Sequence, residues 1–167
     1  EIRGKLITNQ PDENVVKQIG QNMTINWTRQ GNIQTVKIEY SWNNGSNWKL
    51  VNSSVPAALE TWNWSIPLNE TTTVEGKINI TDNDNNQTFN ISSGLFKIKG
   101  SLILLTPSDP GINMTYDGGA STYNITWQRN GGIPGVRLKY STDGIGNWTT
   151  INNTSAVPSY YLWPIPD

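Results

Sequence analysis

The first hundred residues of the chain are patterned as a succession of short strands. Apolar and polar side chains alternate along 22–28 and 36–41, which is the period of a β-strand with one buried face, and no segment keeps a helical period. The sequence Asn43-Asn44-Gly45 follows and favours a hairpin turn, because both residue types tolerate a positive φ. Further strands are predicted at 6–7, 48–51, 62–66, 76–81 and 94–100. About seven short strands at this spacing predict a sandwich of two β-sheets, of the immunoglobulin or fibronectin type III kind.

A second copy of this pattern begins 100 residues further along the chain. The residues that recur unchanged at that offset include Ile25, Trp27, Gly31, Ile33, Val36, Tyr40, Ser41, Asn47 and Trp48. Self-similarity at a fixed distance indicates a duplicated structural unit. The predicted fold is therefore all-β, with two tandem immunoglobulin-like β-sandwiches, domain 1 at residues 6–99 and domain 2 at residues 100–167.

The second repeat is shorter than the first. Repeat one continues for 36 residues beyond Trp64, whereas repeat two continues for four residues beyond its counterpart Trp163. Domain 2 is therefore expected to be incomplete and to lack its last strands in this chain, which would leave an apolar cleft and an open sheet edge. Two explanations are open: the polypeptide continues past Asp167, or another chain supplies the strands.

Residues 1–5 form a predicted N-terminal strand that could be donated to such a cleft in a neighbouring subunit. The sequence Glu1-Ile2-Arg3-Gly4-Lys5-Leu6, our predicted strand-donation interface, is similar to Lys97-Ile98-Lys99-Gly100-Ser101-Leu102. A second alignment sets residues 4–8 against 76–81, so the strand that this segment would replace is open. The other interpretation is that residues 1–5 begin the first strand of domain 1.

The two domains are predicted to be joined almost without a linker. Alternating apolar residues continue from Phe96 to Leu104, and no turn signal occurs before Pro107. The last strand of domain 1 should therefore run nearly directly into the first strand of domain 2, with Leu102 and Leu104 facing inward. Such a junction predicts little flexing between the domains.

Composition excludes several classes of function. The 167 residues contain no cysteine and no histidine, which rules out disulfide bonds, thiolate chemistry, imidazole metal ligands and histidine-based triads. Charged residues make up 15% of the chain and the net charge is −1, so no nucleic-acid partner is predicted. No apolar run approaches the roughly 18 residues of a membrane span. The 13 carboxylates are scattered, so we predict no enzyme activity, no catalytic residue and no cofactor.

Asn-x-Ser/Thr triplets, the acceptors of N-glycosylation, are unusually frequent. With 22 asparagines and 31 serines and threonines, chance would give about four such triplets. Fourteen are present, at Asn22, Asn26, Asn44, Asn52, Asn63, Asn69, Asn79, Asn86, Asn90, Asn113, Asn124, Asn147, Asn152 and Asn153. Four of them lie between inward strand residues and are expected to face solvent: Asn26, Asn63, Asn79 and Asn124. Covalent N-linked glycans, and hence secretion, are predicted, and an accidental excess on Asn/Thr-rich strands is the alternative.

Two further features have both a structural and a functional interpretation. Six of the eight tryptophans pair across the repeats and are predicted core residues, but Trp42 is replaced by Thr142. Trp42 is therefore a candidate contact with a partner or glycan, or else a cover for the adjacent turn.

The run Asp82-Asn83-Asp84-Asn85-Asn86 is rich in oxygen ligands but lacks the Gly and the bidentate Glu of a calcium loop. A turn is favoured there, calcium is the alternative, and no other metal site is predicted.

Several segments of repeat one together resemble the immunoglobulin-like repeats of secreted and cell-surface proteins in microbes. They are Ile25-Asn26-Trp27 and the ranges 36–41, 45–48, 64–67, 77–81 and 96–98. Fungal wall-assembly proteins and Ser/Thr-rich anchored surface proteins carry a similar module, and the resemblance extends through repeat two to Pro166. It implies a role at the cell surface as a spacer, adhesive unit or assembly unit, and it implies no reaction.

These observations predict a structural subunit of an extracellular, N-glycosylated cell-surface filament or fibril. Its partners would be copies of itself, joined end to end by β-strand donation or as tandem repeats, together with glycans. A donor and an acceptor at opposite ends form a heterologous contact, which propagates into an open filament. The alternative function is an adhesive or carbohydrate-binding module of a larger surface protein.

Overall fold

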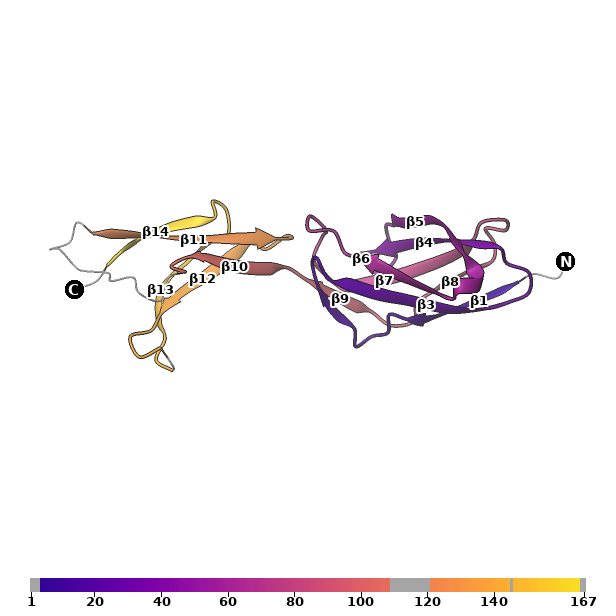
Figure 1. Cartoon of the computed structure of the whole chain (residues 1–167), viewed down its shortest axis with the longest axis horizontal. Helices are drawn as coiled ribbons and strands as arrows, with labels where there is room; N and C mark the ends of the chain where they lie inside the picture. Colours follow the sequence, from indigo (N-terminus) through magenta and orange to yellow (C-terminus); the bar gives the residue numbers. More distant parts are fainter. Residues whose placement is uncertain (1–3, 109–120, 145, 166–167) are drawn as a thin grey trace. The chain divides into compact units, whose positions relative to one another are not determined.

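The structure, a computed structural model, describes residues 4–108, 121–144 and 146–165 (Figure 1). It contains two compact units, unit 1 at Glu1–Lys99 and unit 2 at Gly100–Asp167. Nearly all regular structure in the described residues is β-strand, apart from the short 3-10 helix η1 (Ala57–Leu59). The prediction of an all-β chain is confirmed.

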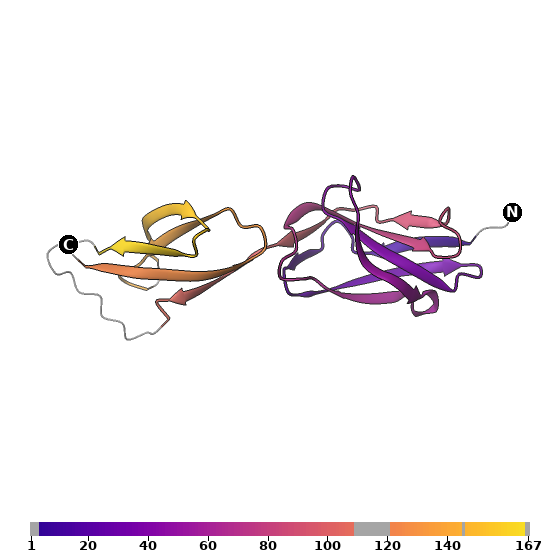
Figure 2. The same cartoon turned by 90° about the horizontal axis from the view of Figure 1, so that it is seen from above.

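Unit 1 is a sandwich of two β-sheets (Figures 1 and 2). One sheet has the order β1-β3-β6, from β1 (Lys5–Gln10), β3 (Asn22–Gln30) and β6 (Thr61–Ser65). The other has the order β2-β9-β7-β4-β5, with β8 beside β7. Its strands are β2 (Val16–Gln18), β4 (Thr35–Ser41), β5 (Lys49–Pro56), β7 (Thr73–Asp82), β8 (Phe89–Ile91) and β9 (Phe96–Lys99). This is the arrangement of an immunoglobulin-like or fibronectin type III-like sandwich.

The alternation in the sequence places the core of unit 1 between these sheets. Along β4, Val36 and Ile38 are fully buried, whereas Lys37 between them lies on the outer face. Trp27 of β3 is 1% exposed, and its indole N–H donates to the carbonyl oxygen of Ala57 at 3.2 Å. The largest core side chain is therefore buried with its one polar atom hydrogen-bonded.

Unit 2 repeats the first part of this plan. β10 (Ser101–Thr106), β11 (Thr122–Asn130) and β14 (Tyr160–Pro164) form one sheet in that order, and β12 (Gly135–Tyr140) pairs with β13 (Thr149–Ser155) in the other. They are the counterparts of β1, β3, β6, β4 and β5. The indole N–H of Trp127 donates to the carbonyl of Ala156 at 3.3 Å, as Trp27 does in unit 1. As predicted, the described residues of unit 2 form no counterpart of β7, β8 or β9.

A single residue separates the last strand of unit 1 from the first strand of unit 2. β9 ends at Lys99 and β10 begins at Ser101, which confirms the predicted direct run of one strand into the next. Leu102 and Leu104 are nevertheless 49% and 57% exposed, contrary to the burial expected from an inward position. In unit 1 the counterpart of Leu102 is Leu6, which is 3% exposed because β7 and β8 contact β1. The described part of unit 2 contains no strand that would cover β10 in this way.

Candidate strand-acceptor groove

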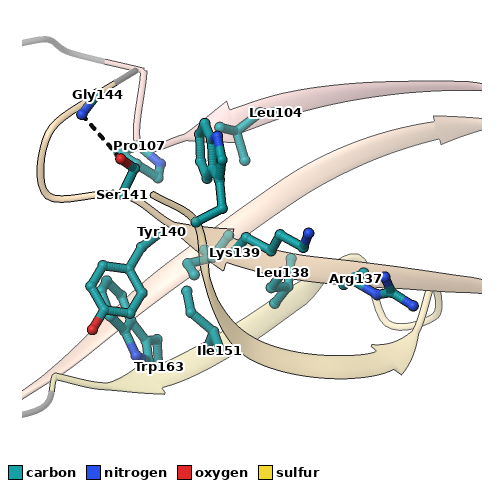
Figure 3. Close-up of a pocket in the computed structure, with 12 residues that line it drawn as sticks. Leu104, Pro107, Arg137, Leu138, Lys139, Tyr140, Ser141, Gly144, Ile151 and Trp163 are labelled. Atoms are coloured by element: carbon teal, nitrogen blue, oxygen red, sulfur yellow. Dashed lines mark hydrogen bonds between the residues drawn. The ribbon is translucent and has the colours of Figure 1, made fainter. Parts of the chain in front are cut away.

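An open groove of about 560 Å³ lies between the two sheets of unit 2 (Figure 3). Large apolar side chains make up most of its lining: Leu104, Ile125, Leu138, Tyr140, Trp148, Ile151 and Trp163. They come from β10, β11, β12, β13, β14 and the turn before β13. As far as the described residues go, the groove is therefore the uncovered interior of a sandwich.

Ile125, Leu138, Tyr140 and Trp163 are the counterparts of closed core residues of unit 1. The prediction that Trp48 and Trp148 are core residues is wrong, because Trp48 is half-buried outside the core cluster and Trp148 is exposed. In unit 1, Tyr40 packs against Trp64 with ring centroids 4.6 Å apart and ring planes tilted by 40°, and both residues are buried. Tyr140 and Trp163 keep almost the same geometry, 5.0 Å and 40°, while both remain half-buried (Figure 3). The groove is thus already arranged as one face of a core, which lowers the cost of ordering it when a strand binds.

Unit 1 shows what normally lies beside this groove. β4 pairs with β5 on one side and with β7 on the other. The backbone N–H of Asn83 donates to the carbonyl of Thr35 at 3.1 Å. Because the residues of an antiparallel strand alternate between its two neighbours, Lys37 and Glu39 direct their backbone N–H and C=O groups toward β7.

The same alternation leaves one edge of β12 open. The backbone N–H of Ala156 donates to the carbonyl of Pro134 at 3.0 Å, so Val136 also directs its backbone groups toward β13. Arg137 and Lys139 then direct theirs to the opposite side, where no strand of the described residues pairs with β12. An open edge beside an apolar groove is the geometry that accepts an added strand.

The predicted donor segment is placed only in part. Residues 1–3 lie outside the described residues. Lys5 pairs with Gln30 in the ladder between β1 and β3, and Leu6 belongs to the core of unit 1. Strand donation by this segment therefore stays a prediction, and it concerns the residues ahead of β1.

Glycine packing decides between the two alignments of that segment. A Cβ atom at Gly4 would come within 2.8 Å of Ile33, and a Cβ at Gly100 within 2.6 Å of Ile133. Because Ile33 and Ile133 are themselves equivalent, Gly4 and Gly100 occupy the same position at the start of each unit. Gly76 is placed differently, since its Cβ would meet the ring of Phe96 at 2.5 Å. The residues ahead of Gly4 therefore align with the end of β9 and not with β7.

Trp42 belongs to an aromatic and ionic cluster of unit 1. It is half-buried and packs against the core, and the Nζ of Lys49 lies 4.7 Å from its ring centroid. The same Nζ forms an ion pair with the Oε1 of Glu70 at 2.5 Å. Trp42 thus covers part of the core, and its role as a partner contact stays a prediction.

Burial and charge shift two pKa values in this cluster. Burial acts to raise the pKa of Glu70, but hydrogen bonds to its carboxylate, that from Lys49 first, hold the pKa below its ordinary value. Burial raises the pKa of Tyr40 well above its ordinary value, and the nearby Glu70 carboxylate adds to the rise. The Tyr40 hydroxyl oxygen is buried without a well-formed hydrogen bond of its own, so burial is the dominant cause.

The sequon asparagines differ in exposure. Exposed are Asn22, Asn44, Asn63, Asn69, Asn86, Asn124, Asn147 and Asn153; half-buried are Asn26, Asn52, Asn79, Asn90 and Asn152; Asn113 lies outside the described residues. Of the four expected to face solvent, Asn63 and Asn124 do so, whereas Asn26 and Asn79 each bury the carboxamide oxygen. The side-chain nitrogen of Asn79 also donates a hydrogen bond to the Oε2 of Glu39 at 3.4 Å. Whether any of the fourteen carries a glycan remains a prediction.

The run Asp82–Asn86 forms a turn. The Oδ1 of Asp82 accepts a hydrogen bond from the N–H of Asp84 at 3.0 Å, and the Oδ1 of Asn85 accepts one from the N–H of Gln87 at 3.1 Å. Side chains of Asp and Asn stabilise tight turns in this way. No group of three or more acidic side chains that could hold a metal ion occurs in the described ranges.

Sequence reasoning missed the cationic character of the open edge of β12. The signal lay in the repeat itself, where Val36-Lys37-Ile38-Glu39-Tyr40 becomes Val136-Arg137-Leu138-Lys139-Tyr140. One acidic residue is thereby replaced by a basic one. The sequence alone does not show that β12, which carries both cations, has an edge that no strand of the described residues pairs with.

Comparisons with known proteins add little to this description. No protein-family model matches the chain, and no curated protein matches it. A solved structure of the fibronectin(III)-like modules of Clostridium thermocellum CbhA is similar, with 17% identity and a TM-score of 0.33, over 97% of this chain and 80% of that chain. At this low TM-score the likeness carries no information about function. No helix among the described residues is long and apolar enough to cross a membrane.

Proposed function

We propose that this chain is a non-catalytic structural module of an extracellular, N-glycosylated filament or fibril at a cell surface. Neighbouring modules are joined end to end by strands that enter the groove of unit 2. The observation that supports this most directly is the combination of a pre-arranged apolar groove with an open sheet edge. In β-augmentation the edge supplies backbone hydrogen bonds for affinity, and the groove supplies side-chain pockets for specificity.

The contact joins unlike surfaces, the groove of unit 2 on one copy and the N-terminal segment of the next. Such a heterologous contact continues into a filament rather than closing into a dimer. Because Leu6 is buried in its own unit, the donor lies ahead of β1. Ordering a donor strand costs about 1–2 kcal/mol per residue, and further contacts between the neighbouring copies would offset that cost.

N-linked glycans are proposed on the exposed sequon asparagines. Their density keeps the outer strand faces hydrated and leaves the groove as an uncovered apolar surface. Extracellular location follows from the same proposal, because N-glycosylation takes place on the secretory route.

Assembly of the whole chain tests the proposal. We expect size-exclusion chromatography with light scattering to show concentration-dependent oligomers, and electron microscopy to show fibres of uniform width. Lys139→Pro removes an edge N–H without taking a hydrogen bond from the ladder between β12 and β13, and it should abolish assembly. Lys139→Ala keeps the N–H and is the matched control. A parent chain that stays monomeric at all concentrations would count against the proposal, and so would fibres that form equally well from Lys139→Pro.

A carbohydrate-binding module is the second candidate, favoured by one observation. Trp148 lines the groove and is 57% exposed, and exposed aromatic rings are the usual platforms for sugars. Titration of the chain with oligosaccharides, with Trp148→Ala as the negative control, separates this candidate from the filament. Saturable binding that is lost in Trp148→Ala would favour it.

A further inference from the structure

We propose that β12 accepts an antiparallel partner strand with aliphatic residues on its inner face and Asp or Glu on its outer face. This inference rests on the proposed function, namely that the groove accepts a strand at all. The inference specifies the residue types of the strand that binds best beside β12.

Unit 1 shows the register of such a strand. Ile78 and Ile80 of β7 lie opposite inward residues of β4 and are 0% exposed. In the same register beside β12, the aliphatic residues of an incoming strand lie opposite Tyr140 and Leu138, which line the groove. The inner face of the partner is therefore apolar at alternate positions.

The outward residues of β4 compensate one another in unit 1. The Nζ of Lys37 forms an ion pair with the Oε2 of Glu39 at 3.1 Å. Opposite these two residues, β7 places Thr81 and Asn79, which are both uncharged. The ion pair on β4 has no net charge, and the residues opposite it on β7 are uncharged.

In unit 2 the equivalent pair is Arg137 and Lys139, and both are exposed cations. The described residues give neither of them an ion pair. The Nε of Arg137 donates to the Oδ1 of Asn153 at 3.1 Å, which supplies no compensating charge, and β13 contains no charged residue. The outer face of β12 therefore carries two positive charges, with the Arg137 guanidinium held toward β13 and Lys139 exposed on the same strand. Opposite charges across a pair of strands stabilise the pairing and like charges oppose it, so acidic residues are favoured at both positions.

The same argument disfavours the N-terminal segment at this edge. With Ile2 in the position of Ile78, opposite Tyr140, Arg3 would face Lys139 and Lys5 would face Arg137. Both pairs place like charges opposite each other. This agrees with the glycine packing, which aligns the segment with β9. In the groove of a neighbouring copy, the N-terminal segment therefore fits the position of β9, and the acidic strand takes the position of β7 between that segment and β12.

Peptides with the sequence of residues 73–99 test the preference, because they supply counterparts of β7, β8 and β9 together. Three fluorescently labelled versions are compared: unchanged, Asn79→Glu with Thr81→Glu, and Asn79→Lys with Thr81→Lys. We expect fluorescence anisotropy with the whole chain to show that the acidic peptide binds about tenfold more tightly than the basic one at low salt. The difference should shrink as salt screens the charges. A chain with Arg137→Gln and Lys139→Gln should bind the acidic and basic peptides equally.

The outcomes separate this inference from the proposed function. Equal affinities of the acidic and basic peptides, with binding that Lys139→Pro abolishes, would overturn the charge preference and leave the groove as an acceptor. Binding by none of the peptides would count against the proposed function itself. Oligomers of the chain that the acidic peptide fails to dissociate would show that the edge of β12 binds a strand of the neighbouring copy more tightly than an acidic strand, which overturns the charge preference.

Discussion

At the scale of single residues, the two repeats differ in a partly buried ion pair beside the core of unit 1. The ion pair of Lys49 with Glu70 occurs in unit 1 only, because the counterpart of Lys49 is Thr149. The Glu70 side chain is 10% exposed and that of Lys49 is 40% exposed. A carboxylate this shielded depends on its hydrogen bonds, and removal of the partner or of the charge is expected to weaken unit 1.

Glu70→Gln should lower the free energy of unfolding of unit 1 by about 1–2 kcal/mol, a value limited by the exposure of Lys49. The folded-state pKa of Glu70 is lowered, so the ionised group contributes stability above its ordinary pKa. That contribution is lost as the pH falls through the folded-state pKa. Thermal unfolding from neutral to acidic pH should therefore show a smaller acid-side loss in Glu70→Gln than in the parent chain. Glu13→Gln, at an exposed position, is the control, and identical pH profiles for all three chains would contradict the expectation.

At the scale of elements, the same position has opposite importance in the two units. Glu39 of β4 directs its backbone toward β7, whereas its counterpart Lys139 of β12 faces an edge where the described residues offer no strand. In a strand between two neighbours, every backbone N–H that is removed costs a hydrogen bond of the sheet. In an edge strand, the N–H groups on the open side can be removed without that loss.

Proline substitution at these two positions makes the difference measurable. Glu39→Pro should destabilise unit 1 by about 3 kcal/mol or more, because it removes a hydrogen bond between β4 and β7 and places a ring against β7. Lys139→Pro should change the stability of unit 2 by less than about 1 kcal/mol. Calorimetry of the two variants checks this, with Glu39→Ala reporting the loss of the ion pair alone. Equal destabilisation by the two prolines would show that β12 is not an edge.

The sequence predicted the longer strands and missed the shortest ones. β3, β4 and β7 are long enough for alternation to show, so their buried faces could be predicted. β2 (Val16–Gln18) and β8 (Phe89–Ile91) are too short for any period, and they form because β9 and β7 lie beside them. The groove could be expected from the shorter second repeat. Its cationic edge could not, because the orientation of Arg137 and Lys139 follows from strand pairing.

At the scale of the whole molecule, the units differ in how far their cores are closed. Core residues such as Val36, Ile38 and Tyr40 are at most 1% exposed in unit 1, whereas their counterparts in unit 2 are half-buried. Apolar burial supplies most of the stability of a domain, at about 25 cal/mol per Å². Unit 2 is therefore expected to be the less stable unit until a strand covers its groove.

Calorimetry of the whole chain should accordingly show two transitions, the lower one from unit 2. Addition of the acidic peptide should raise the lower transition and leave the upper one unchanged, because a ligand stabilises only the unit that binds it. Trp127→Ala and Trp27→Ala assign the transitions, since each removes the central side chain of one core. A single transition that both variants shift together would contradict the expected independence of the units.

Glycan occupancy should follow the exposure of the acceptor asparagines. Asn63 and Asn124 are exposed and should carry glycans on the chain from its native source, whereas Asn26 and Asn79 should be modified less. Mass spectrometry after amidase release detects occupied sites as Asn converted to Asp. Higher occupancy at the two half-buried sites would show that modification precedes folding, and unmodified peptides at all four would end the prediction of a glycan coat.

The junction at Gly100 also determines how the chain would respond to a pulling force. One residue can span at most about 3.6 Å when fully extended, so there is almost no slack to draw out between β9 and β10. Tension would pass from the hydrogen bonds of one strand to those of the next without an elastic spacer to soften it. Single-molecule stretching should therefore show no gradual lengthening before the first abrupt event, which is the rupture of unit 2. A fibre built from such modules would resist stretch up to a yield point and then extend in steps.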